Sequence, residues 1–251
     1  MRYKPPMPDP PPPPLTDSPQ SQPAITRDEK TLRWFEVFLV LLIAVGDPLL
    51  GSFYIFIHGA SSAPPLSNTS WLTGLGREVV GLLLLGYVLH RRGRRFKDLG
   101  LHWSLRDVGT GVIVAVASYA AYAFGFFAVQ TFHFVVYGTP GAGHSAKQIF
   151  GHPPAAALLY SVVNGFFEEL IVRAYLMTEI IELTGSSSLA VILSVAIQFS
   201  YHLYYGWSTA LSLSFMFLVF AIYYARSRRA LPIIFAHEII DLLGLIRLWH
   251  V

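Results

Sequence analysis

The chain has 251 residues, of which 53% are hydrophobic and only 13% are charged, and its formal net charge is +3. Soluble domains carry about a quarter charged residues, so this composition excludes an ordinary soluble protein and indicates a polytopic membrane protein. The basic residues lie beside apolar runs, where they set membrane orientation, so the positive charge does not indicate nucleic-acid binding. The chain has no cysteine, which excludes disulfides, thiolate nucleophiles and cysteine-ligated zinc.

The N-terminal segment 1–31 is rich in proline, including an unbroken run at 10–14. Its apolar content is too low for folding, and proline favours extended conformations. It also lacks the apolar run and small-residue cleavage site of a signal peptide. We therefore expect a disordered cytoplasmic tail at 1–31 and a transmembrane domain at 32–251. A ligand for a proline-recognising module is the alternative for the tail.

About seven apolar segments follow, each near the roughly 20 residues that a helix needs to cross a bilayer. Backbone groups in lipid must be satisfied within the segment, so each is expected to be a helix. The segments span residues 34–57, 71–89, 108–132, 154–181, 189–205, 208–224 and 231–249. The expected fold is all-α, a polytopic bundle of about seven transmembrane helices. Pro48 removes a backbone donor and should kink the first helix.

Basic residues predict the orientation of the bundle. They cluster before the first span, after the second and after the sixth, whereas the loops at 61–70 and 139–153 carry only Lys147. All three clusters fall on one side if the N-terminus is cytoplasmic and the C-terminus is outside. The compact core, without a eukaryotic targeting signal, favours the inner membrane of a bacterium.

Two adjacent glutamates, Glu168 and Glu169, lie inside the fourth apolar segment and are followed by Arg173. Each ionisable group at the bilayer centre costs a few kcal/mol, so three of them within six residues need a function. Glu169 and Arg173 are four residues apart, share a helix face and can form an ion pair. Glu168 points elsewhere, which leaves its carboxylate free for proton transfer.

Two later segments add His202 and the pair His237 and Asp241, which again share a helix face. Alone, a buried glutamate–arginine pair can be a clamp between helices, and a membrane histidine can be an interhelical hydrogen bond. Together, these groups on three of the seven spans indicate a polar active site within the membrane. Other charged residues have structural interpretations. Asp47 would cap the helix broken at Pro48, and Glu78 would pair with Arg77 at the interface, whereas Glu238 stays ambiguous.

The order of these motifs resembles the CPBP family, the CAAX-processing and bacteriocin-processing (Abi) intramembrane proteases. The resemblance covers 155–245 and consists of Glu-Glu-x-x-x-Arg, then His202 after an aromatic run, then His237-x-x-x-Asp241. There are two departures. Gln198 stands where the family usually has phenylalanine, and Asp241 stands where many members have asparagine. An ionised aspartate cannot donate to an oxyanion, so Asp241 must be protonated, bind a metal or orient His237.

This resemblance implies hydrolysis of a peptide bond within or next to the membrane. Glu168, assisted by His202, would take a proton from the attacking water. His237 with Asp241 would stabilise the oxyanion, while Glu169 and Arg173 would fix the geometry. Zinc held by Glu168, His202 and His237 is an open alternative, because these ligands suffice for a catalytic site while the glutamate–water scheme requires no metal.

The partners implied are the lipid bilayer and a membrane-embedded or membrane-proximal peptide or protein substrate, without nucleic acid. The rival function is a proton- or ion-coupled transporter that uses the same groups as a relay. A family member without proteolytic activity, acting as a binding or immunity protein, is a third interpretation. The retained glutamate and both histidines count against the third.

Overall fold

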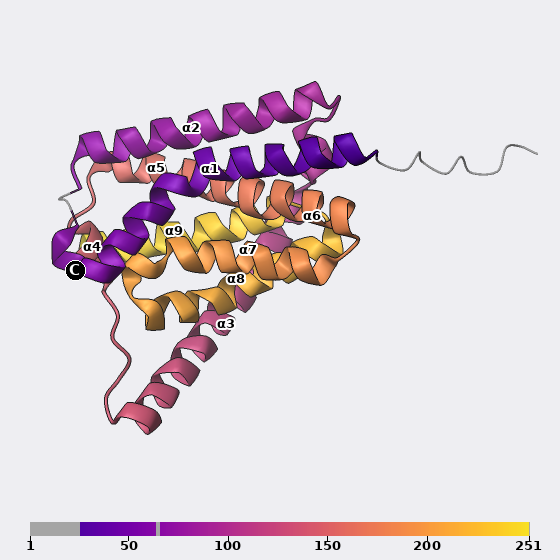
Figure 1. Cartoon of the computed structure of the whole chain (residues 1–251). Coiled ribbons are helices and arrows are strands. Elements are labelled where there is room, and N and C mark those ends of the chain that lie inside the picture. The colour runs from indigo at the N-terminus through magenta and orange to yellow at the C-terminus, as the bar shows by residue number, and fades with distance from the viewer. Residues whose placement is uncertain (1–25, 64–65, 251) are drawn as a thin grey trace, which may run out of the picture.

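The structure is a computed structural model that describes residues 26–63 and 66–250. All but the end of the expected proline-rich tail lies outside this part. Figure 1 shows long helices running side by side as a bundle, and the residues described form no β-strand. The fold is all-α, as the sequence predicts.

Each apolar segment of the sequence corresponds to helix. The helices are α1 (Arg27–His58), α2 (Asn68–Arg91), α3 (Leu105–Tyr137), α4 (Ala146–Phe150), α5 (Ala155–Glu168), the π-helix η3 (Glu169–Tyr175), α6 (Leu176–Thr184), α7 (Ser187–Tyr201), α8 (Trp207–Ser227) and α9 (Leu231–His250). Short 3₁₀ turns lie at Ala60–Ser62 (η1), Phe96–Leu99 (η2) and Leu203–Tyr205 (η4). Helices α5, η3 and α6 follow one another without a break and together form the fourth predicted span.

Within the described residues, five helices are long and apolar enough to cross a membrane: α1, α2, α3, the α5–α6 unit and α8. Helix α7 is apolar but has only 15 residues. Helix α9 has 20 residues and carries Glu238, Asp241 and Arg247. Large apolar side chains also cover the outer surface, among them Leu50 and Phe127, which are 73% and 71% exposed. Such an apolar exterior requires a lipid environment, so the chain is an integral membrane protein.

Helix α1 begins earlier than the expected boundary at residue 32. The side chain of Thr26 caps the helix by accepting a hydrogen bond from the Glu29 backbone, and Asp28 and Glu29 occupy the positive first turn. The last residues of the expected tail are therefore helical. Pro48 lies within α1, and Figure 1 shows α1 changing direction along its length, in keeping with the predicted kink.

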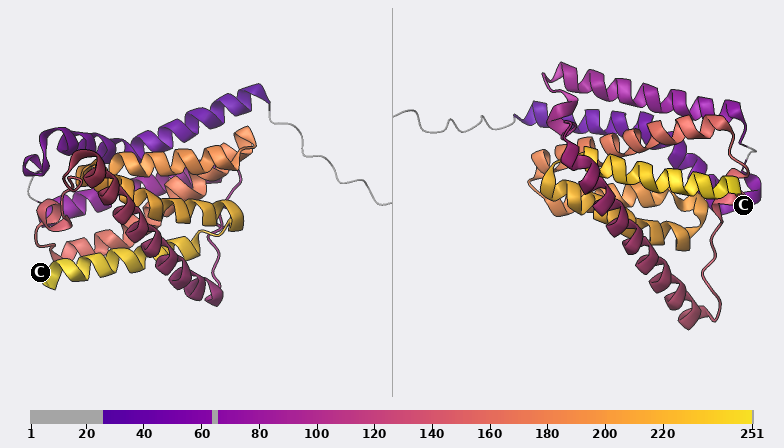
Figure 2. Two further views of the ribbon diagram at one scale, coloured as in Figure 1. Left: turned by 90° about the horizontal axis from the view of Figure 1, so that it is seen from below. Right: turned by 180° about the vertical axis from the view of Figure 1, so that it is seen from behind.

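The α5–α6 unit lies at the centre of the bundle. Helix α2 packs on α5, and α1 contacts α7. Helix α3 packs on α8 and α9, and Figure 2 shows it crossing the bundle obliquely. All seven residues of η3 are buried, including Glu169 and Arg173. The predicted charged motif is thus at the most enclosed level of the fold, where an unpartnered charge is costly.

Candidate active site

The paired glutamates lie at a junction between two kinds of helix. Glu168 is the last residue of α5, and Glu169 is the first residue of the π-helical η3. A π-helix has a wider turn than an α-helix and is frequent at functional sites. The predicted ion pair of Glu169 with Arg173 is present: Glu169 Oε2 and Arg173 Nε are 3.8 Å apart, which is too long for a hydrogen bond.

Three side chains donate hydrogen bonds to the Glu168 carboxylate. Gln198 Nε2 and the Tyr201 hydroxyl both donate to Oε2, at 2.8 and 2.9 Å, and Asn164 Nδ2 donates to Oε1 at 3.3 Å. Hydrogen bonds of this kind favour the ionised carboxylate. They also fix its orientation, with two donors on one oxygen and one long contact on the other.

Gln198 connects the two parts of the Glu-Glu-x-x-x-Arg motif. Its amide nitrogen donates to Glu168, and its Oε1 accepts a hydrogen bond from Arg173 Nη2. The Arg173 guanidinium also lies over the Phe217 ring, 5.5 Å from the centroid. Gln198 stands where the CPBP family usually has phenylalanine. Here it connects Glu168 to the buried guanidinium of Arg173 through two hydrogen bonds.

His237 lies between two carboxylates. Its Nδ1 is 2.9 Å from Glu169 Oε1, and its Nε2 is 3.7 Å from Asp241 Oδ1. A carboxylate accepts the Nδ1 proton, so Glu169 fixes the ring orientation and the tautomer. Asp241 is near His237, as expected from their spacing. Glu169 makes its closer contact with His237, at 2.9 Å, and its longer contact with Arg173, at 3.8 Å.

His202 comes from the end of α7 rather than from its interior. Helix α7 ends at Tyr201, and His202 Nδ1 lies 2.8 Å from the Gln198 carbonyl oxygen, to which it must donate. The neutral ring then has an unprotonated Nε2. Tyr204 and Phe217 lie on the ring, with centroid separations of 5.8 and 4.8 Å. The predicted fifth span is thus shorter than residues 189–205.

These groups meet at one cavity of about 880 Å³. Glu168, His202, His237 and Asp241 line it, whereas Glu169 and Arg173 lie behind its wall and are 0% exposed. The structure therefore brings the six predicted residues together. Four of them can meet a substrate, and the other two can hold the first four in place.

The comparison with known families concerns the part of the chain that carries the six predicted site residues. Residues 150–243 match the family model for type II CAAX prenyl endopeptidase Rce1-like proteins. This segment is similar to that family over 94 of the 251 residues of the chain. No curated protein and no solved structure matches the chain. At the level of the family, the match confirms the resemblance inferred from the motifs.

One carboxylate of the site lies outside the segment that matches the family model. Glu78 of α2 is 1% exposed, lines the cavity and accepts a hydrogen bond of 2.8 Å from Asn164 Nδ2, the same nitrogen that contacts Glu168. The sequence interpretation of Glu78 as an interfacial partner of Arg77 was wrong. Arg77 pairs instead with Asp47 across α1 and α2, so Asp47 is an interhelical partner rather than a helix cap.

Asn164 and Tyr201 were also missed, although both had a signal in the sequence. Asn164 precedes Glu168 by four residues and therefore shares its helix face. Tyr201 directly precedes His202 in the second motif. A polar residue one turn before a membrane carboxylate is a signal that can be searched for in other chains.

The three predicted zinc ligands, Glu168, His202 and His237, already have hydrogen-bond partners in the protein. The Nδ1 contacts of His202 and His237 leave Nε2 of each ring available as a ligand, as in many metal sites. Both oxygens of Glu168, in contrast, accept hydrogen bonds from protein donors. Among the residues described, no three histidine, aspartate or glutamate side chains group closely enough to hold a metal ion. The described residues as arranged do not fit a zinc ion, and the glutamate–water scheme requires no metal. Zinc stays a prediction that a chelator experiment can test.

Proposed function

We propose that the chain is an intramembrane endopeptidase that hydrolyses a peptide bond in or next to the bilayer, with Glu168 as the base that activates water. The observation that supports this proposal is the hydrogen-bonded Glu168 carboxyl group in the wall of a cavity that two histidines also line. The family match to membrane endopeptidases supports the same reaction class.

The roles follow from the hydrogen-bond directions. Glu168 Oε2 is occupied by two donors, so Oε1, with its single 3.3 Å contact, is the atom that would accept the proton of water. His202 Nε2 is an acceptor in the neutral ring and would orient the same water across the cavity. No hydrogen bond joins His202 to Glu168 among the described residues, and in this mechanism the attacking water would lie between them.

His237 would stabilise the oxyanion. A histidine held between Glu169 and Asp241 is suited to the positive charge of an imidazolium, and its Nε2–H can donate to the developing oxyanion. Arg173 and Gln198 would maintain this arrangement from behind the wall, because both are fully buried and neither lines the cavity.

The test is cleavage of a library of membrane-proximal peptides by the purified protein in detergent, with products identified by mass spectrometry. We expect cleavage by the wild type and a loss of cleavage in His237→Ala, because the oxyanion donor is removed. A parallel reaction with a chelator separates the two chemistries: retained cleavage favours the glutamate–water scheme, whereas loss that zinc reverses favours a zinc enzyme. A wild type that cleaves no peptide contradicts the proposal.

A further inference from the structure

The two ends of the active-site cavity differ. From Glu168 and His237 the lining runs along α1, α2, α5 and α9 to the first turn of α2 and to α4. Ser67 and Thr69 line the cavity at this end and are exposed. The cavity is therefore open toward the end of the bundle that carries α4 and the start of α2.

The opposite end is closed by a packed layer. The Phe220 ring lies 5.8 Å from that of His237, and one turn further on Tyr224 donates hydrogen bonds to the backbone of Leu99 and Ala174. Phe220 and Tyr224 are at most 1% exposed, as is Tyr175. None of the three lines the cavity. The catalytic groups thus have no opening on this side in the part of the chain that the structure describes.

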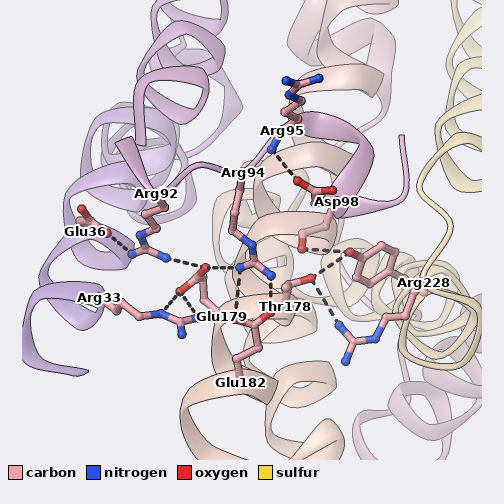
Figure 3. Close-up of polar contacts among 12 residues, drawn as sticks. Arg33, Glu36, Arg92, Arg94, Arg95, Asp98, Thr178, Glu179, Glu182 and Arg228 are labelled. Carbon is pink, nitrogen blue, oxygen red and sulfur yellow. Dashed lines mark hydrogen bonds and ion pairs between the residues drawn. The ribbon is translucent and has the colours of Figure 1, made fainter. Parts of the chain in front are cut away.

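Beyond this layer an ion-pair network covers the closed end. Figure 3 shows Glu179 of α6 between Arg33 of α1, Arg92 after α2, and Arg94, with Arg228 on the nearby Thr178. Arg33 Nε and Arg92 Nη1 lie 2.9 and 2.7 Å from the Glu179 carboxylate, which is 0% exposed. The network ties α1, α2 and α6 together at the closed end.

The same end holds twelve of the sixteen lysines and arginines in residues 26–63 and 66–250. The lysines and arginines there are Arg27, Lys30, Arg33, Arg91, Arg92, Arg94, Arg95, Lys97, Arg106, Arg226, Arg228 and Arg229. The other four are Arg77 of α2, Lys147 of α4, the buried Arg173 and Arg247 near the end of α9. Basic residues beside membrane spans mark the cytoplasmic side, so the closed end is assigned to the cytoplasm.

We infer that the active-site cavity opens to the extracytoplasmic side of the membrane and that its substrate is a peptide segment presented there. This inference rests on the proposed protease function. It assigns an extracytoplasmic juxtamembrane or secreted peptide as the substrate class and excludes a cytosolic C-terminus. Trp71, Phe150, Tyr160 and Tyr204 line the cavity between its mouth and the catalytic groups. A predominantly apolar, uncharged segment fits these walls.

The absence of cysteine from the chain allows a direct test with single-cysteine variants. Thr69→Cys reports on the mouth, Ser161→Cys on the cavity wall, and Lys97→Cys on the exposed closed end. A membrane-impermeant thiol reagent is applied to right-side-out and inverted vesicles from expressing cells. We expect labelling of Thr69→Cys and Ser161→Cys in right-side-out vesicles only, and of Lys97→Cys in inverted vesicles only. Labelling of Ser161→Cys from the same side as Lys97→Cys overturns the inference.

Cleavage is then measured on the same two vesicle types with an impermeant peptide that the detergent-solubilised enzyme cleaves. Right-side-out vesicles should cleave it, and inverted vesicles should show no cleavage until detergent is added. Cleavage by inverted vesicles alone contradicts the inference while leaving the protease function intact. If no peptide is cleaved in detergent, the proposed function fails, and the thiol labelling still decides where the cavity opens.

Discussion

Gln198→Leu removes the bridge between the two buried charges of the site. Gln198 is 0% exposed, donates to Glu168 Oε2 at 2.8 Å and accepts from Arg173 Nη2. Leucine fills a similar volume but can make neither bond. The substitution therefore tests whether the position that departs from the family pattern supports Glu168.

The magnitude follows from the partners that remain. A hydrogen bond to a charged group contributes about 1.5–3 kcal/mol, so losing two such bonds costs about 3–6 kcal/mol at most. Glu168 keeps Tyr201 and Asn164 as donors, whereas Arg173 keeps the 3.8 Å ion pair with Glu169 and the Phe217 ring. We therefore expect the free energy of unfolding to fall by about 3–4 kcal/mol, which is the lower part of the range for two such bonds.

The assay combines unfolding in mixed micelles with steady-state cleavage. Tyr201→Phe removes one bond and should cost about 1.5–3 kcal/mol, and Ser200→Ala, which loses only a bond within its own helix, should be nearly neutral. In Gln198→Leu, kcat should fall more than KM rises, because Gln198 does not line the cavity. If Gln198→Leu keeps both the stability and the kcat of the wild type, Gln198 does not support Glu168 in the way described here.

Three further predictions concern residues around and beyond the catalytic groups. Asp241→Asn should retain cleavage if Asp241 only orients or supplements His237, and should lose cleavage in a way that zinc restores if it binds metal. Glu78→Gln should reduce kcat partially without unfolding the protein, because a neutral amide holds Asn164 less strongly than a carboxylate does; unchanged kinetics would show that Glu78 is only structural. Gly100→Ala should destabilise the bundle by about 1–3 kcal/mol more than Gly93→Ala in micelle unfolding. Both glycines have positive φ, but only at Gly100 would a Cβ meet backbone, that of Arg228. Equal losses in the two variants would refute this packing argument.

Hydropathy predicted the helices well because lipid permits few alternatives to a helix. The seven apolar segments match α1, α2, α3, the α5–α6 unit, α7, α8 and α9. The features that hydropathy did not predict lie where tertiary contacts set the local backbone geometry. The π-helix at Glu169–Tyr175 and the early end of α7 at Tyr201 depend on tertiary contacts that hydropathy does not encode.

The membership of the site could be predicted from the sequence better than its internal pairing. Charged groups in apolar segments are costly apart, so their convergence follows from energetics. Which group meets which depends on how helices pack. Glu169 meets His237 across helices, and Glu78 enters the site because Arg77, its neighbour in sequence, turns to Asp47. Sequence spacing describes one helix at a time and cannot supply these interhelical choices.

The most direct measurement of the central claim is the cleavage rate of Glu168→Gln beside Glu238→Gln in the same peptide assay. Glutamine keeps the shape of residue 168 but cannot accept a proton at neutral pH. Glu238 follows His237 on α9, but its carboxylate packs against Gly165 and does not line the cavity. We predict that Glu168→Gln loses cleavage while remaining folded and that Glu238→Gln retains it. Full activity in Glu168→Gln would show that Glu168 is not the base.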